Sequence, residues 1–252
     1  MVTSVPRYPS RVHTQDAVRR AHVIAVVIAA TLLGAAAIAI AQDPGTHPIS
    51  GRRYALPMSV EGAAWLERPE RIAEENPDLA LRLIGIARGS TIADIGAGSG
   101  YFTIRMARLA GPEGRVYASD IQPGMLTLLR ANVARTELKN VTPVLGAVDD
   151  PKLPRESIDL ALMVDVYHEF SEPQRMLHHI REALKPTGRL VLLEYRAEDP
   201  AVPILPSHKM TVAQVKLEVE HEGFRLDRIY HELPRQHLLI FTRQEGARPP
   251  AR

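Results

Sequence analysis

Two hydrophobic patterns alternate along the middle of the chain. Short apolar runs bounded by polar or turn residues are typical of buried strands, and apolar residues spaced three or four apart are typical of helices. Strands are expected at 91–95, 115–120, 141–146, 158–165 and 189–195. Helices are expected at 77–86, 100–110, 123–135 and 172–184. This alternation predicts an α/β fold, with a largely parallel sheet covered by helices.

The pattern changes after residue 195. The segment "TVAQVKLEVEHEG" (211–223) predicts a helix that ends at Gly223. Two β-like runs follow at 224–233 and 237–243, and only "PRQ" separates them. Such a short connection predicts a hairpin. Together with the five earlier strands, the hairpin brings the expected sheet to seven strands.

The first part of the chain has a different character. Residues 1–20 carry four arginines and one aspartate, and residues 21–41 carry no Asp, Glu, Lys or Arg. An apolar stretch of this length spans a bilayer core, and an A-x-A pattern before Gln42 fits a cleaved secretory signal. We therefore expect a signal peptide or a membrane anchor over 1–41, with the body exported or held on the extracytoplasmic side. The body is cytoplasmic if the segment has neither role.

Proline and glycine mark the expected boundaries of the folded body. Residues 42–60 contain three prolines and two glycines and are predicted to form a linker. The folded domain is expected over 61–243, and 244–252 is predicted to be a disordered tail.

Composition limits the chemistry. The chain of 252 residues has no cysteine, which excludes disulfides, thiolate metal sites and cysteine nucleophiles. The 31 basic residues nearly balance the 29 acidic ones and form no stripe, so no nucleic-acid partner is expected. We assign no metal ligands from the sequence, and it predicts no oligomeric state.

A glycine-rich loop follows the first expected strand. A phosphate-binding P-loop needs Lys and then Ser or Thr after its last glycine, whereas Tyr101 and Phe102 follow Gly100 here. A dinucleotide fingerprint has the spacing G-x-G-x-x-G, whereas Gly96, Gly98 and Gly100 have the spacing G-x-G-x-G. The spacing therefore excludes the first kind of site and disfavours the second.

The stretch "ADIGAGSGYF" resembles motif I of the class I S-adenosylmethionine-dependent methyltransferases, and the resemblance extends over about 61–243. It implies a Rossmann-like, doubly wound sheet of seven strands, with the last strand antiparallel and helices on both faces. It also implies in-line transfer of a methyl group from S-adenosylmethionine to a small-molecule or lipid acceptor. The loop residues implied to contact this cofactor are Asp94, Gly96, Ala97, Gly98, Gly100 and Tyr101.

Two further segments are implied to bind the cofactor. Asp120 ends the second strand, where a carboxylate accepts hydrogen bonds from ribose hydroxyls, and Ile121 is implied to pack on the adenine. The segment "LGAVDDPKLP" resembles the family's adenine segment, but Ala147 stands where the family has an aspartate. Candidates for that contact are the backbone of Ala147 or Val148 and the side chain of Asp149. The alternative for Asp149 is a solvated turn.

The reaction side is expected after the fourth strand. The candidate catalytic residues are Asp165, Tyr167 and His168, which follow this strand, because the ligand of a doubly wound sheet lies beyond the carboxyl ends of the strands. His168 is the candidate general base because histidine titrates near neutral pH. The alternative is that His168 caps a helix or packs on the cofactor. Further side chains expected along the same rim are Glu194, Tyr195, Arg196 and His208.

Two functions from other classes stay open. One is an exported, non-catalytic protein that keeps the fold and binds a ligand. The other is a nicotinamide-dependent oxidoreductase, which the early third glycine and the terminal hairpin disfavour. Within the methyltransferases, the absence of cysteine argues against arsenite as acceptor, because related enzymes rely on thiols for it.

Overall fold

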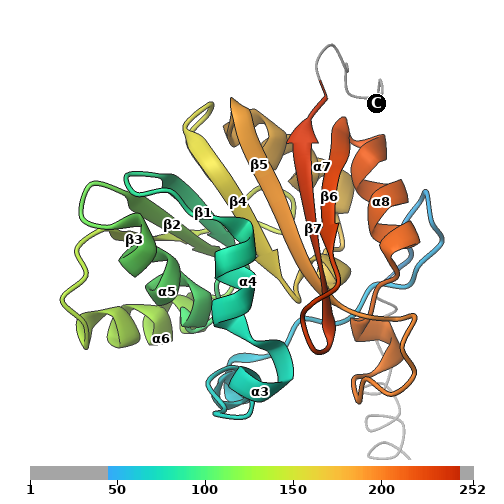
Figure 1. Cartoon of the computed structure of the whole chain (residues 1–252), viewed down its shortest axis with the longest axis horizontal. Helices are drawn as coiled ribbons and strands as arrows, with labels where there is room; N and C mark the ends of the chain where they lie inside the picture. The colour runs from blue at the N-terminus through green and yellow to red at the C-terminus, as the bar shows by residue number, and fades with distance from the viewer. Residues whose placement is uncertain (1–44, 245–252) are drawn as a thin grey trace, which may run out of the picture. The chain divides into compact units, whose positions relative to one another are not determined.

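A single sheet of seven strands has the order β3-β2-β1-β4-β5-β7-β6 in this computed structural model, which describes residues 45–244 (Figure 1). The signal or anchor predicted at 1–41 and nearly all of the predicted tail lie outside the described residues. Strands β1 to β5 pair in parallel, and β7 runs antiparallel to both β5 and β6. The predicted doubly wound fold with an antiparallel last strand is confirmed.

The strands begin and end close to the predicted positions. Their bounds are β1 Thr91–Ile95, β2 Arg115–Asp120, β3 Val141–Leu145, β4 Ile158–Val164, β5 Leu184–Tyr195, β6 Phe224–Tyr230 and β7 Gln236–Arg243. The start of β5 was predicted wrongly at residue 189, because Leu184 and the following "KPTGR" also belong to this strand. Leu184 pairs with Ile158 across a register shift and is fully buried, so β5 begins directly after the preceding helix.

Helices cover both faces of the sheet. Their bounds are α2 Ala63–Leu66, α3 Arg71–Glu75, α4 Pro77–Ile84, α5 Tyr101–Ala110, α6 Pro123–Ala134, α7 Pro173–Ala183 and α8 Val212–His221. Three single 3₁₀ turns are η1 Val60–Gly62, η2 Tyr167–Glu169 and η3 Pro206–His208. Among the residues described, no helix combines the length and the apolar character needed to cross a membrane.

The core has two main layers, one on each face of the sheet. Alternate residues of a strand point to opposite faces, so Leu190 and Leu192 join α7 and α8 in one layer. Val191 and Leu193 join α4 and α5 in the other layer. Burying one such side chain contributes about 1.5–3 kcal/mol. Because both faces of the sheet are packed against these layers, the carboxyl ends of the strands are held in fixed positions.

The described part of the predicted linker packs on the domain. Arg52 forms a two-bond ion pair with Glu218 of α8, at 3.1 Å from Nε to Oε1 and 3.0 Å from Nη2 to Oε2. Arg52 Nη1 and the Ala55 amide both donate to the His168 carbonyl, at 2.9 Å and 3.0 Å. Residues 45–60 thus tie α8 to the turn that carries His168.

The Arg52–Glu218 pair leads to a stability prediction. Both side chains are buried, so removing the carboxylate leaves an unpaired buried guanidinium. We expect Glu218→Ala to lower the free energy of unfolding by about 3–5 kcal/mol. Denaturant titration of the purified protein measures this change.

A matched control lies on the same helix. Lys216 pairs with Glu220 at 3.0 Å on the surface of α8, where such a pair contributes about 0.5 kcal/mol or less. Lys216→Ala should therefore leave the unfolding midpoint almost unchanged. A loss of only about 1 kcal/mol in Glu218→Ala contradicts the clamping role of the pair.

Candidate active site at the carboxyl edge of the sheet

The glycine loop joins β1 to α5 through three left-handed residues. Gly96, Gly98 and Gly100 have φ values of 71°, 54° and 93°, a region that favours glycine. A Cβ atom added to Gly96 would collide with Val166 Cγ2, so a side chain there forces a shift. The Gly96 amide also donates to the Ser119 carbonyl at 2.8 Å. The loop is held tightly between the ends of β2 and β4.

Asp120 lies directly against this loop. Its Oδ2 accepts from the Gly98 amide at 2.9 Å, and its Oδ1 accepts from the Gln122 amide at 2.8 Å. Burial raises the pKa of Asp120, and these amide hydrogen bonds counteract part of the rise. A carboxylate oxygen accepts more than one hydrogen bond, so acceptor capacity remains for ligand hydroxyls.

Two apolar side chains flank Asp120 without being buried themselves. Ile121 is 40% exposed and Val148 is 52% exposed, and their loops are joined by the Gly146 amide, which donates to the Asp120 carbonyl at 3.0 Å. Apolar side chains open to solvent beside a polar site suit the face of an aromatic ring.

The other adenine candidates have partners within the protein. The Ala147 amide donates to the Asp150 carbonyl at 2.8 Å. Asp149 pairs with Arg175 of α7 at 2.5 Å. An adenine contact by Ala147, Val148 or Asp149 stays a prediction, and among these residues Val148 offers an exposed apolar side chain.

Buried charge gathers where β1 ends. Asp94 accepts a hydrogen bond from Thr103 Oγ1 at 2.5 Å, and burial raises its pKa to about 6. Arg71 is also buried, donates to Glu75 at 2.7 Å, and lies 4.2 Å from the ring centre of Tyr101. The positive charge of Arg71 partly offsets the rise at Asp94. Acidic side chains and the guanidinium of Arg71 therefore lie together beside the glycine loop.

Three polar atoms of this region are shielded from solvent and have no hydrogen-bond partner within residues 45–244: Tyr101 Oη, Asp165 Oδ1 and Gln236 Oε1. Asp165 follows β4 with a φ of 49°, and its Oδ2 accepts from Gln236 Nε2 at 2.7 Å. Buried polar groups normally have partners. The unpaired atoms therefore fit a ligand with a polar, charged end, as S-adenosylmethionine has at its amino-acid part.

The predicted catalytic histidine is held from both sides. His168 Nδ1 lies 2.6 Å from Glu194 Oε2, and His168 Nε2 lies 3.1 Å from His208 Nδ1. Burial lowers the pKa of His168, but the Glu194 carboxylate outweighs it and the net pKa is raised. His208 comes from η3, 40 residues away in sequence. The expected rim thus brings His168, Glu194 and His208 together.

The side chain of Tyr167 lies in the hydrophobic core rather than beside His168, Glu194 and His208. Its side chain is fully buried in the core layer that contains α7 and α8, and its ring packs edge-on against Phe170. This placement favours a packing role for Tyr167 over the predicted catalytic one. Its backbone amide contributes instead, because it donates to Glu194 Oε1 at 3.0 Å.

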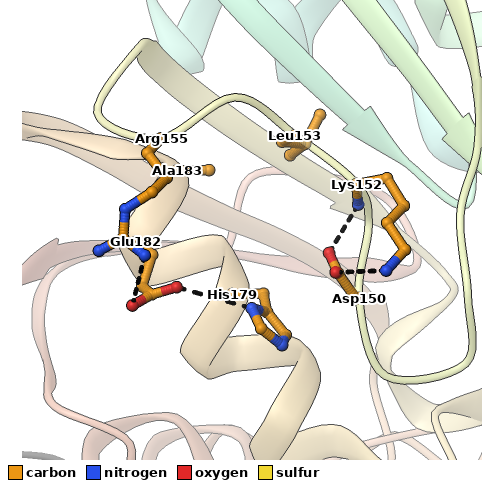
Figure 2. Close-up of a pocket in the computed structure, with 7 residues that line it drawn as sticks. All are labelled: Asp150, Lys152, Leu153, Arg155, His179, Glu182 and Ala183. Atoms are coloured by element: carbon orange, nitrogen blue, oxygen red, sulfur yellow. Dashed lines mark hydrogen bonds and ion pairs between the residues drawn. The ribbon is translucent and has the colours of Figure 1, made fainter.

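A separate surface cavity of about 420 Å³ lies between loop 150–155 and α7 (Figure 2). Charged pairs line it: Arg155 with Glu182 at 3.0 Å and Lys152 with Asp150 at 2.7 Å. None of its lining residues belongs to the glycine loop, to η2 or to the Asp120 turn. The cavity and the predicted cofactor contacts are therefore different features.

The known proteins that this chain resembles include methyltransferases. Residues 86–232, more than half of the chain, match the model of the family described as "Methyltransferase domain". The chain is 31% identical over 107 residues to an arsenite methyltransferase of Halobacterium salinarum, covering 42% of this chain and 27% of that protein. It is 35% identical over 116 residues to a demethylmenaquinone methyltransferase of Tropheryma whipplei, covering 46% of each.

A solved structure resembles the fold more completely. An S-adenosylmethionine-dependent methyltransferase from Aquifex aeolicus superposes with a TM-score of 0.70 at 25% identity, covering 73% of this chain and 98% of that one. By contrast, the chain spans between about a quarter and a half of the length of the curated relatives it matches.

Asp94 leads to a prediction about pH. Its pKa is about 6 in the folded chain and 3.8 as an ordinary value. Between these values the unfolded chain releases the proton while the folded chain keeps it, so the free energy of unfolding falls as pH rises. The difference between the two pKa values corresponds to roughly 3 kcal/mol of unfolding free energy. Asp94→Asn has no carboxyl group to titrate here. Between about pH 4 and pH 7, its free energy of unfolding should therefore rise by about this amount relative to that of the unmutated protein.

Urea unfolding of the unmutated protein and of Asp94→Asn at about pH 4 and about pH 7, without added cofactor, measures this change in the free energy of unfolding. The asparagine oxygen still accepts from Thr103, which preserves the local hydrogen bond. A stability difference that stays constant with pH contradicts the buried titration of Asp94.

Proposed function

This chain belongs to the methyltransferase domain family, and from that premise we propose that it transfers a methyl group from S-adenosylmethionine to a small-molecule or lipid acceptor. The observation that carries the proposal is the glycine loop held against Asp120, at the carboxyl ends of β1 and β2. In a doubly wound sheet this is the place where nucleoside ligands bind.

The chain's residues suit the three parts of the cofactor. Asp120 is placed to accept hydrogen bonds from the ribose hydroxyls, and Ile121 and Val148 offer apolar surface for the adenine. Arg71 offers a buried cation for the carboxylate of the amino-acid part, and Asp165 Oδ1, which has no hydrogen-bond partner among the described residues, offers an acceptor oxygen for its ammonium. When bound, the cofactor supplies an electrophilic methyl group on a sulfonium.

The protein's contribution to the transfer is mainly positional. An in-line displacement depends on close approach, alignment and exclusion of water. Gly96 brings the glycine loop against Val166, two residues before His168, so the predicted cofactor side and acceptor side adjoin. Glu194 orients the His168 ring, whose second nitrogen is the candidate proton acceptor from an acceptor hydroxyl.

Similarity supports an organic acceptor. One relative is named for demethylmenaquinone, and another is named for arsenite. The absence of cysteine disfavours arsenite for this chain, because thiols support that reaction in related enzymes. We therefore propose a small or lipid-soluble organic acceptor.

Calorimetry tests the cofactor directly. We expect the purified protein to bind S-adenosylmethionine and not NAD. Asp120→Ala should weaken S-adenosylmethionine binding at least about tenfold, because a hydrogen bond to a charged group contributes about 1.5–3 kcal/mol. The exposed Asp227 of β6 provides a matched control, and Asp227→Ala should bind as the unmutated protein does.

Each outcome separates the candidate functions. Binding of NAD alone supports the oxidoreductase, and binding of neither ligand supports a non-catalytic ligand-binding protein. Unchanged affinity in Asp120→Ala removes this residue from the ribose role.

We also propose that residues 1–41 direct export or membrane attachment of the body, on the basis of the arginine-flanked apolar stretch alone. Mass spectrometry of the N-terminus of protein purified from its native cells tests this proposal. Cleavage before Gln42 is the expected result for a secretory signal. An intact Met1 in protein recovered from the cytoplasmic fraction refutes both forms of the proposal.

A further inference from the structure

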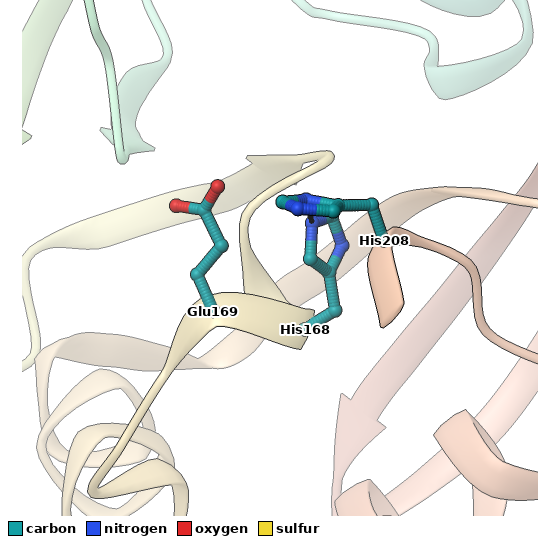
Figure 3. A group of neighbouring side chains, drawn as sticks. All are labelled: His168, Glu169 and His208. Carbon is teal, nitrogen blue, oxygen red and sulfur yellow. Dashed lines mark hydrogen bonds between the residues drawn. The ribbon is translucent and has the colours of Figure 1, made fainter. Parts of the chain in front are cut away.

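Three side chains on the predicted acceptor side have the chemistry of a metal-binding set. His168 and Glu169 lie on η2, and His208 reaches them from η3 (Figure 3). One ligand atom from each lies within 4.8 Å of the other two. Two imidazoles with one carboxylate are the protein ligands of several catalytic zinc and non-haem iron centres. We propose that His168, Glu169 and His208 bind a divalent transition-metal ion, for which zinc is the probe.

The two histidines already have the spacing of neighbouring ligands. His168 Nε2 and His208 Nδ1 are 3.1 Å apart, and their rings meet edge-on at 79°. Two nitrogens bound to tetrahedral zinc at about 2.0 Å lie roughly 3.3 Å from each other. These two nitrogens share a hydrogen bond in the structure, so a bound ion takes the place of its proton and the rings turn to direct both lone pairs at the ion.

Glu194 fixes the form of His168 that a metal requires. Its Oε2 lies 2.6 Å from His168 Nδ1, so this nitrogen carries the proton and Nε2 presents its lone pair. The carboxylate is itself fully buried, and its Oε1 accepts from the Tyr167 amide at 3.0 Å, which holds its orientation. A carboxylate that orients a ligating histidine in this way is common in metal sites.

Glu169 supplies the third side of the group. It leaves η2 next to His168, and its carboxylate rises on the same side as the two rings (Figure 3). The carboxylate is held by the Met58 amide, and the side chain is half-buried. Rotation about its side-chain bonds brings an oxygen from within 4.8 Å to a ligand spacing of about 3.3 Å.

Charge around the group also suits a cation. Glu169 and Glu194 place two carboxylates beside the rings, and Arg52 is nearby but donates to the His168 carbonyl, on the backbone side. The ion would lie beside these carboxylates, while the guanidinium of Arg52 is turned away from it toward Glu218 and the His168 carbonyl.

The ion has a chemical consequence for the acceptor. Three protein ligands leave at least one coordination position open, and an oxygen of the acceptor is the donor that suits it. This step rests on the proposed function, whereas metal binding itself does not. Metal binding and proton acceptance exclude each other at His168 Nε2, so the ion replaces the predicted general base.

Metal content tests the site without any turnover assay. The purified full chain, with any affinity tag removed, is stripped with a chelator and titrated with Zn²⁺ and with Co²⁺ as a coloured probe. We expect one equivalent of tightly bound ion, with Co²⁺ absorption typical of nitrogen and oxygen ligands. His208→Ala and Glu169→Gln should lose stoichiometric binding, and Glu194→Gln should weaken it about 10- to 100-fold.

A second histidine pair provides the matched control. His178 and His179 lie on the surface of α7, each with its nearest nitrogen 3.6 Å from Glu182. His178→Ala should bind the ion as the unmutated protein does. His208 is half-buried, so we expect its replacement to preserve the fold, and circular dichroism of the variant checks this. Equal binding by His208→Ala, or less than one equivalent in the unmutated protein, overturns the metal site.

Binding of S-adenosylmethionine is measured on the same preparations. Cofactor binding without metal binding overturns this inference and leaves the proposed function standing. Metal binding without cofactor binding supports the site and removes the proposed function.

Discussion

The contact between Gly96 and Val166 is the constraint on which the site depends. Strand order reverses between β1 and β4, so the loops that follow these two strands diverge and leave a place for a ligand. A glycine at position 96 lets the loops approach at their base, because a Cβ atom added there would collide with Val166. The cofactor loop and the turn bearing His168 are therefore positioned by one shared packing contact.

Several buried charges in this protein are arranged in pairs. Arg52 with Glu218, Arg71 with Glu75, and His168 with Glu194 are all shielded from solvent. Such pairs add little net stability compared with apolar packing, but each fixes the direction of a side chain. Precise direction is what a positional mechanism needs.

Local patterns predicted much of the fold and only part of the site. The bounds of β1 and β2 follow from short apolar runs ended by Gly96 and Asp120, where sequence and structure agree. The start of β5 depends on the pairing of Leu184 with Ile158. The spacing of apolar residues along the sequence does not indicate such a long-range contact. Elements with their own local signal were predictable, and register across the sheet was not.

The site shows the same division. The glycine loop could be recognised because its residues are contiguous, whereas His208 meets His168 only after the chain has passed through β5. Arg52 gave no signal because its partner Glu218 is 166 residues away. The burial of Tyr167 was hidden because a 3₁₀ turn of three residues has no reliable periodicity.

The segment at 45–60 also bears on how the domain opens. Arg52 and the Ala55 amide share the His168 carbonyl, while the Met58 carbonyl accepts from Gln122 beside Asp120. One stretch of backbone thus bridges both sides of the site. We therefore expect its detachment and the loosening of η2 to occur together, so that their amides exchange with a common opening free energy.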